Sequence, residues 1–303
     1  MTAMWGRAMR RRHDTLVAAA FLAPAALLLM GVIFYPIVQT FYAAVCRVDR
    51  KGNPVAFGTL ENFRALAASD VFTREIVPQT VVWTVAVVGG TMLISLFVAL
   101  ALNERLPGRR LLRAIVLLPW ATSLVITAAI FTWMLHPTQG PVNGLLRAWG
   151  IADAPPAWLA RPELAFACVI VVGIWVSIPF TSTVLLAGLQ SIPDELHEAA
   201  LIDGASAWQR LRAITLPLLR PVLLVADVHK DIYVFNSFPL IWVMTEGGPA
   251  NQTHIIVTWM YRIAIREREF GQGYAMAVIT FAFLLIFAVV YSWLFGREEV
   301  DRL

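Results

Sequence analysis

Four ionisable side chains lie within one strongly apolar segment, at Asp227, His229, Lys230 and Asp231. At helical spacing Asp227 and Lys230 lie on one face and can form an ion pair, and Asp231 shares that face. Ionisable groups at membrane depth are costly, so they normally line a cavity or pair with one another. Two interpretations therefore stay open: a polar wall of a cavity that crosses the membrane, or an internally paired cluster at an interface between subunits.

The sequence offers little for catalysis or for a bound cofactor. Asp227 and His229 have no further histidine at a matching depth, so we expect no metal site. The only lysines, Lys51 and Lys230, lie outside any Gly-x-x-x-x-Gly-Lys-Ser/Thr motif, which excludes a P-loop ATP site in this chain. A nucleophile elbow and a His-Glu-x-x-His motif are also lacking from the sequence. We therefore expect a chain that is not an enzyme and binds no cofactor of its own.

The composition indicates a membrane protein. Hydrophobic residues make up 59% and charged residues only 15% of the 303 residues, against about 25% charged in soluble domains. Backbone polar groups must be paired within hydrocarbon, so long apolar segments there must be helices. The expected fold is all-α, with one membrane domain of residues 16–295 between an N-terminal tail, 1–15, and a C-terminal tail, 296–303. Six spans are predicted, at residues 16–45, 76–102, 114–135, 164–189, 218–244 and 274–295.

Positive charge sets the expected orientation of these spans. The first span follows a run of arginines and is too long for the apolar core of a cleavable signal peptide. The short turn 103–113 is also rich in arginine, and positive residues in short loops favour the cytoplasmic side. Both termini are therefore predicted to be cytoplasmic. The basic residues meet anionic lipid headgroups, and nucleic acid is not needed to explain them. The outward-facing loops are then residues 47–75, 136–163 and 245–273.

The loop of residues 190–217 differs from the others because it is polar and favours helices. Pro193 and the acidic residues after it are typical of a helix start, and Gly204 should end that helix. Ser206 can cap a second helix, which Pro217 and Pro221 are expected to end. Two short amphipathic helices that meet at a glycine predict a compact knob on the cytoplasmic face.

This knob resembles the EAA loop of bacterial importer permeases of the ATP-binding-cassette (ABC) class. That pattern is Glu-Ala-Ala, three residues, Gly, nine residues, Ile, one residue and Leu-Pro. Asp203 and the residues after Gly204 narrow the resemblance to the carbohydrate-uptake branch, the relatives of the maltose and glycerol-phosphate permeases. The family pattern is matched at every position, by Glu198, Ala199, Ala200, Gly204, Ile214, Leu216 and Pro217.

A second resemblance to the same branch follows at residues 235–249. Relatives usually read Phe-Asn-x-Phe-Asp-x-x-Tyr, whereas this chain has Pro239 in place of the Asp and Trp242 in place of the Tyr. Pro239 should break the fifth span about halfway, and interrupted helices of this kind line substrate sites in transporters. The candidate residues of the substrate pathway are Lys230, Asp231, Tyr233, Asn236, Ser237, Phe238 and Trp242.

The resemblance implies a type I ABC importer permease with six transmembrane helices, working by alternating access in the cell inner membrane. It implies three partners: a second, homologous permease; a homodimeric cytoplasmic ATPase, which binds ATP and Mg; and an extracytoplasmic sugar-binding protein. The ATPase would dock on the knob, which Glu198, Asp203 and Gly204 help to form. The alternatives are a secondary transporter with Asp227, His229 and Asp231 as a proton relay, and an intramembrane enzyme. The secondary transporter predicts inverted repeats, which the sequence does not show, and leaves the EAA pattern unexplained, whereas the enzyme lacks a recognisable catalytic set.

Overall fold

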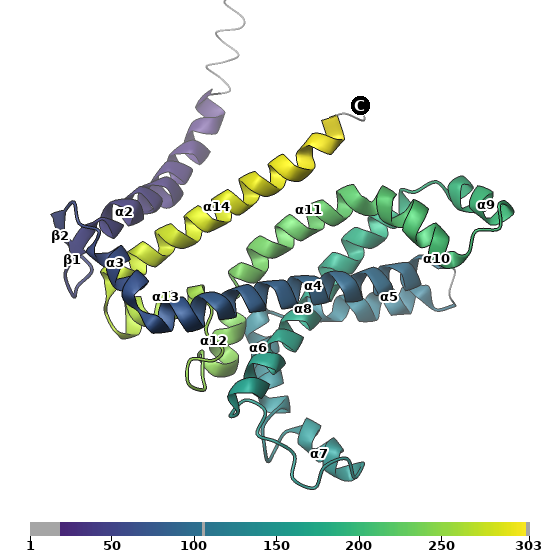
Figure 1. Ribbon diagram of the computed structural model, residues 1–303, viewed down its shortest axis with the longest axis horizontal. Helices are drawn as coiled ribbons and strands as arrows, with labels where there is room; N and C mark the ends of the chain where they lie inside the picture. Colours follow the sequence, from purple (N-terminus) through teal and green to yellow (C-terminus); the bar gives the residue numbers. More distant parts are fainter. Residues whose placement is uncertain (1–18, 105–106, 301–303) are drawn as a thin grey trace, which may run out of the picture. The chain divides into compact units, whose positions relative to one another are not determined.

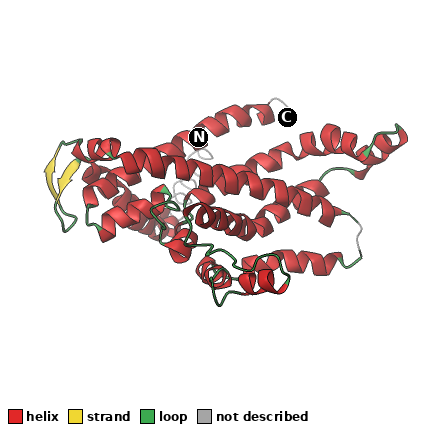
Figure 2. Cartoon of the chain, turned by 60° about the horizontal axis from the view of Figure 1, so that its bottom comes forward, coloured by secondary structure: helices red, strands yellow, loops and turns green. Residues whose placement is uncertain are grey.

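The computed structural model describes residues 19–104 and 107–300, without the side chains at positions 228, 229, 231, 232 and 291–300. The predicted cytoplasmic tail 1–15 and the last residues of the tail 296–303 lie outside the described residues. The described chain is predominantly helical (Figures 1 and 2), as the all-α prediction requires. It forms two compact units, one of residues up to Ala65 with Ile263–Ile279, and one of Leu66–Arg262 with the C-terminal segment from Thr280.

The first unit contains a long apolar helix, Ala19–Ala44, whose last part is α2, Tyr35–Ala44. A β-hairpin follows, in which β1, Cys46–Val48, pairs antiparallel with β2, Pro54–Phe57. The unit also includes the start of α3, Glu61–Ala68, most of the π-helical turn η5, Arg262–Arg266, and the start of α14, Phe270–Val300.

The second unit is a bundle of helices around α4 and α8. Its elements, in chain order, are η2 Phe72–Ile76, α4 Val77–Asn103, α5 Arg109–Leu117, η3 Leu118–Ala121, α6 Leu124–Met134, α7 Pro141–Ala148, α8 Pro162–Gln190, α9 Asp194–Ile202, α10 Ala207–Arg210, η4 Leu211–Thr215, α11 Leu216–Phe235, α12 Phe238–Thr245 and α13 Ile256–Tyr261.

The core of this bundle depends on a close approach of α8 to α4. Trp83 of α4 is fully buried, and a Cβ added to Gly173 of α8 would lie 2.7 Å from its ring. Because glycine has no side chain, the indole of Trp83 fills the space between the two helices. The buried residues around this contact include Val87, Val169 and Val234.

Helices occupy all six ranges predicted as spans, but they do not all meet the length and apolarity of a single span. In the described part of the chain four helices do: Ala19–Ala44, Phe72–Asn103, Pro162–Gln190 and Phe270–Val290. A fifth is possible if Arg109–Ala121 and Leu124–Met134, which are bent by 96°, count as one span. The count of six spans stays a prediction.

Two of the predicted spans are not single helices, for local reasons. The predicted span 114–135 bends where Thr122 is extended and Ser123 caps a new helix by accepting from the Ile126 N–H. The predicted span 218–244 is divided between α11 and α12, and α11 carries Arg220 and Lys230 among its charged residues.

Candidate functional site

The knob predicted from residues 190–217 is present at one end of the second unit, where Figure 1 shows α9 and α10 beyond the end of α8. Its first limb is α9, which has Asp194 and Glu195 in its first turn, where negative charge complements the helix dipole. Gly204 follows the C-terminus of α9 with φ of +77°, a left-handed conformation that glycine adopts without strain. A Cβ at Gly204 would meet no heavy atom within 4 Å, so backbone conformation alone accounts for the glycine here.

The second limb begins with a reciprocal cap. The Ser206 hydroxyl accepts from the Gln209 N–H at 3.3 Å, and the Gln209 side-chain oxygen accepts from the Ser206 N–H at 2.7 Å. The prediction that Pro217 and Pro221 end this helix was wrong. α10 continues through the π-helical turn η4 into α11, Pro217 lies in the first turn of α11, and Pro221 lies inside it. Each proline removes one N–H from this continuous helical run without ending it, and the wider π turn η4 lies directly before the turn that contains Pro217.

The EAA residues divide into an exposed group and a group that anchors the knob. Glu198, Ala199 and Gly204 are exposed on the knob, as is Asp203, whereas Ile214 and Leu216 are half-buried at its base. The knob also exposes large apolar side chains, which are normally covered by a partner. These are Leu196, Leu201, Trp208 and Ile202, the last of them 87% exposed.

The second candidate region is the break in the predicted fifth span. α11 ends at Phe235, and α12 begins at Phe238 with Pro239 in its first turn, so the interruption predicted from Pro239 is confirmed. The last carbonyls of a helix lack partners within it. One of them, at Val234, accepts from the Trp83 indole N–H at 2.9 Å, and both residues are buried. Trp83 of α4 thus stabilises the broken end of α11.

We expect Trp83→Phe to destabilise the second unit by about 1 kcal/mol, because it removes the indole N–H from the buried Val234 carbonyl, which keeps the Ser237 N–H at 3.2 Å, while most of the packing is kept. Thermal unfolding of the purified protein in detergent measures this. Trp133→Phe is the matched control, since Trp133 is 56% exposed. Equal unfolding temperatures for the two variants would contradict the role given to the Trp83 hydrogen bond.

The candidate pathway residues before the break occupy different environments. Lys230 is only 3% exposed, and its Nζ lies 5.2 Å from the centre of the Tyr233 ring. Tyr233 is 45% exposed, and Asn236 is exposed. Ser237 is buried, and its hydroxyl donates to the Tyr233 carbonyl at 3.3 Å, so it supports the break itself. The side chain of Asp231 lies outside the described residues, and the pairing of Asp227 with Lys230 stays a prediction.

Three aromatic rings gather just after the break. Phe238 and Trp242, one turn apart on α12, stack at 5.4 Å between ring centroids. Tyr261, at the end of α13, packs edgewise on Trp242 at 4.8 Å and tilted on Phe238 at 5.0 Å. Tyr261 was missed by the sequence reasoning. Nothing in the local pattern marks it, because its contact depends on how the loop between α12 and α13 folds.

That loop is tightly hydrogen-bonded. The Thr245 and Thr253 hydroxyls lie 2.7 Å apart, and Thr253 also donates to the Gly248 carbonyl at 2.9 Å. Thr80 of α4 accepts from the Ile256 N–H at 2.9 Å. The loop therefore fixes the start of α13, and with it Tyr261, to α12 and α4.

His254 lies at the centre of this loop and is fully buried. Its Nδ1 is 3.0 Å from the Thr258 hydroxyl, and its ring packs edgewise on Trp259. Burial, together with the positive charge of Arg262, lowers the pKa of His254 from 6.5 to about 4. The folded loop thus holds a neutral imidazole.

We expect the folded protein to lose stability as the pH falls from about 6.5 towards 4, because the unfolded chain then binds a proton at His254 that the folded chain excludes. The full loss is on the order of 3 kcal/mol. Above pH 6.5 this contribution is constant. Unfolding temperatures of the wild type and His254→Gln between pH 7 and pH 4 measure it, and a parallel decline in the two proteins would contradict it.

Comparison with known proteins identifies the family. Residues 91–298, more than half of the chain, match the family described as binding-protein-dependent transport system inner membrane component. The chain belongs to this family. It is therefore a multi-pass inner-membrane permease that serves a transport system dependent on a binding protein, and its role is transport and not catalysis.

Proteins similar to the permease over most of their length support this assignment. It is 46% identical to a probable ABC transporter permease of Brucella suis biovar 1 over 276 residues, which are 91% of this chain and 95% of the relative. It is 38% identical to the trehalose/maltose transport system permease MalF of Thermococcus litoralis, over 86% of each chain.

Solved structures share the fold of the permease. A bacterial ABC transporter involved in the import of the acidic polysaccharide alginate matches with a TM-score of 0.82 and 25% identity, over 96% of this chain and 99% of that one. The same kind of transporter in complex with a periplasmic protein that carries an alginate pentasaccharide matches with a TM-score of 0.81 and 26% identity, over 95% of this chain and 96% of that one. The fold is that of a type I ABC importer permease.

Proposed function

We propose that the permease imports a sugar, or a related polyol or sugar phosphate, in an ABC importer driven by a separate ATPase. The observation that carries the proposal is the knob, which keeps the complete EAA pattern and exposes Glu198, Ala199 and Gly204. The small alanine lets the backbone of α9 enter a cleft of the ATPase, where Glu198 pairs with a basic group. The trehalose/maltose relative and the alginate importers support a carbohydrate as substrate.

The proposed complex contains two related permeases around one pathway. A homodimeric cytoplasmic ATPase binds ATP and Mg and docks one subunit on each knob. An extracytoplasmic binding protein delivers the sugar, as the periplasmic protein of the alginate system carries its pentasaccharide. In this arrangement the knob and both termini are cytoplasmic, and the loop 245–273 faces outward.

The proposed mechanism is alternating access, with the knob as a lever. The helical run from Ala207 through η4 and α11 to Phe235 is continuous, so a displacement of the knob passes along one element to the break at Asn236. Closure of the ATPase on ATP thus moves the segment that carries the pathway candidates. The two end states of this element couple ATP binding to the orientation of the site.

The proposed substrate contacts lie on both sides of the break. Tyr233 and Asn236 are exposed and offer a ring face and an amide for hydrogen bonds. Phe238, Trp242 and Tyr261 form an aromatic wall beyond them. Sugars are bound by such a combination, because their C–H faces stack on rings while their hydroxyl groups pair with polar side chains.

Uptake into right-side-out membrane vesicles loaded with ATP tests the proposal. The vesicles contain the permease with its partner subunits and its binding protein, and receive radiolabelled trehalose, maltose, glycerol phosphate or alginate oligosaccharides in turn. We expect one class of these compounds to accumulate in an ATP-dependent manner, and Trp242→Ala to reduce its uptake. Accumulation that follows a proton gradient without ATP would instead favour the relay of Asp227, His229 and Asp231.

A further inference from the structure

The β-hairpin that follows the first span exposes large apolar side chains on a rigid support. Val55 and Phe57 of β2 are 67% and 70% exposed, and Leu60, just after the strand, is 57% exposed. Val55 and Phe57 belong to the same short strand, whose register with β1 shifts at Val55. Exposed apolar side chains that gather in this way mark a contact surface.

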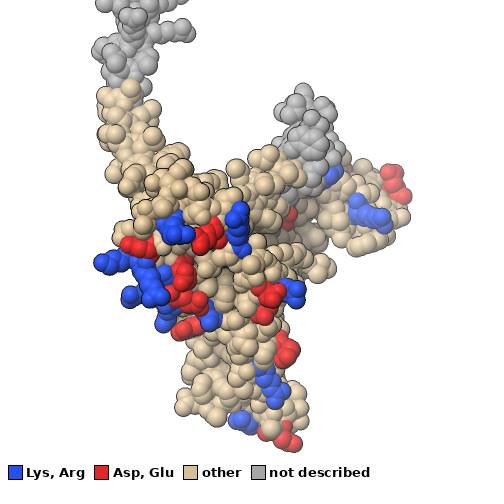
Figure 3. All heavy atoms as spheres, turned by 60° about the vertical axis from the view of Figure 1, so that its left-hand side comes forward, with Lys and Arg blue, Asp and Glu red and all other residues tan. Residues whose placement is uncertain are grey.

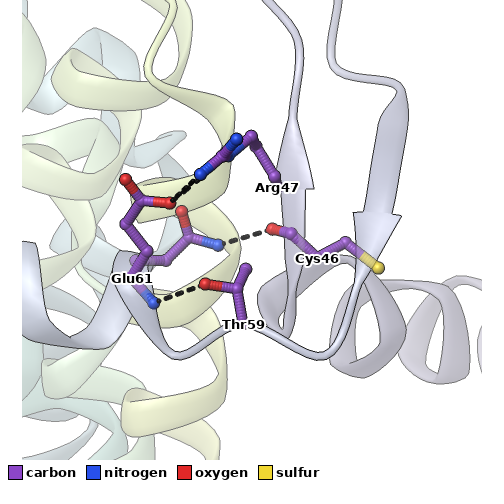
Figure 4. Close-up of polar contacts among 5 residues, drawn as sticks. Cys46, Arg47, Thr59 and Glu61 are labelled. Atoms are coloured by element: carbon purple, nitrogen blue, oxygen red, sulfur yellow. Dashed lines mark hydrogen bonds and ion pairs between the residues drawn. The ribbon is translucent and has the colours of Figure 1, made fainter.

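Several contacts within the first unit fix the position of this hairpin. The Asn62 amide donates to the Ala44 carbonyl at 3.0 Å and to the Cys46 carbonyl at 2.8 Å, which ties the end of the first span and β1 to α3. The Arg47 guanidinium lies 3.1 Å from a Glu61 carboxylate oxygen, as Figure 4 shows together with the Cys46 contact. A two-stranded hairpin is only marginally stable alone, so these contacts are what hold it at a fixed distance from the span.

The apolar surface of the hairpin continues that of the first span. Phe57 stacks on Tyr42, with ring centroids 5.5 Å apart and ring planes inclined by 10°. Tyr42 lies in the last turn of the apolar helix Ala19–Ala44, and it is half exposed. Tyrosine at the end of a membrane span normally lies at the boundary between hydrocarbon and water. The ring of Phe57 must then lie at that boundary too.

Apart from Arg47, which pairs with Glu61, the charges of the hairpin lie at its turn. Arg50 and Lys51 are exposed there, and the Asp49 carboxylate accepts from the Lys51 and Asn53 N–H groups at 2.8 Å. The Asp49 carboxylate thus forms hydrogen bonds within the turn, while the side chains of Arg50 and Lys51 extend from the turn. Figure 3 brings forward the side of the molecule on which Figure 1 labels β1 and β2, and it shows positive and negative side chains together on that side. An apolar strand beside a cationic turn is the composition of an interfacial membrane contact.

We propose that β2 is an interfacial anchor, which inserts Val55, Phe57 and Leu60 among phospholipids at the end of the first span and holds lipid phosphates with Arg50 and Lys51. The anchor fixes the depth at which this span ends in the bilayer. In the proposed orientation this boundary belongs to the outer leaflet. The assignment of the hairpin to the boundary does not depend on the sugar that is carried.

Spin-label accessibility tests the anchor in the assembled transporter, reconstituted in nanodiscs of phosphatidylethanolamine and phosphatidylglycerol. Val55→Cys, Phe57→Cys and Lys51→Cys are labelled one at a time in a Cys46→Ala/Cys168→Ala background. We expect the labels at positions 55 and 57 to be relaxed more by oxygen, and several-fold less by a water-soluble nickel chelate, than the label at position 51. Equal accessibility to the chelate at all three positions would place the strand in water and overturn the proposal.

Protection of positions 55 and 57 from both reagents would also overturn it, because a protein would then cover the strand. If the labels at these positions became less accessible when the binding protein was added, that protein, and not lipid, would be the partner that covers the strand. Cys46 is a buried residue of β1, so a second probe keeps it intact. A photoreactive benzoyl group at Phe57 in the native chain should form adducts with phospholipid, and adducts with protein alone would overturn the anchor.

Discussion

Glu198→Arg is expected to abolish ATP-driven uptake while the permease remains folded in the membrane. Glu198 is exposed on α9, so its replacement disturbs no buried contact of this chain. At the ATPase, however, the change turns an attractive charge pair into a repulsive one. Losing such a pair at an interface typically costs about 2–5 kcal/mol, which corresponds to a loss of affinity of roughly 30-fold to several thousand-fold. Uptake and co-purification of the ATPase are measured on the same membranes.

Arg212→Glu is the matched control for this experiment. It makes a charge change of the same size on the second limb of the knob, at an exposed residue outside the EAA pattern. We expect it to keep most of the uptake. Uptake at the wild-type level in Glu198→Arg would contradict the proposed role of α9 in coupling to the ATPase.

Gly247→Ala is expected to disrupt the loop between α12 and α13. A Cβ at Gly247 would lie 2.0 Å from the buried ring of His254, and the residue has φ of +84°. The left-handed backbone alone costs an alanine about 1–2 kcal/mol, and displacing the packed His254 ring adds a further 1–3 kcal/mol. We expect a clear drop in unfolding temperature, together with reduced uptake, since the loop positions Tyr261 against Phe238 and Trp242.

Gly89→Ala serves as the control for this change. Gly89 lies within α4, and a Cβ there would meet no heavy atom within 4 Å. The double variant Gly247→Ala/His254→Ala separates the two causes, because it removes the steric overlap but keeps the backbone strain. It should recover part of the stability. If Gly247→Ala unfolded and transported like Gly89→Ala, the tight packing of this loop would be refuted.

The features that could be predicted from the sequence are the local ones. The knob depends on Pro193, Gly204 and Ser206, each of which acts on the backbone next to it, and the structure has the expected limbs and bend. Pro239 likewise marks the break between α11 and α12, because a proline has no N–H to donate within a helix.

The features that the sequence did not predict depend on tertiary contacts or on subtle backbone geometry. The Trp83 indole reaches the Val234 carbonyl across 151 residues of sequence, and Tyr261 meets Trp242 only because its loop folds back. The continuation of the helix past Pro217 depends on the π turn before it, which has no clear sequence signal. The bend of 96° after η3 was not predicted either, because the apolar residues on its two sides favour one straight span.

The central claim is that this permease works only with a separate ATPase and a second permease. Affinity purification of the tagged chain from its native membrane in mild detergent, followed by identification of the bound proteins and an assay of ATP hydrolysis, tests it most directly. The account predicts that a P-loop ATPase and a related permease co-purify with ATPase activity, and that Glu198→Arg loses the ATPase. A chain that purifies alone, and that transports in proteoliposomes on a proton gradient without ATP, would contradict the account.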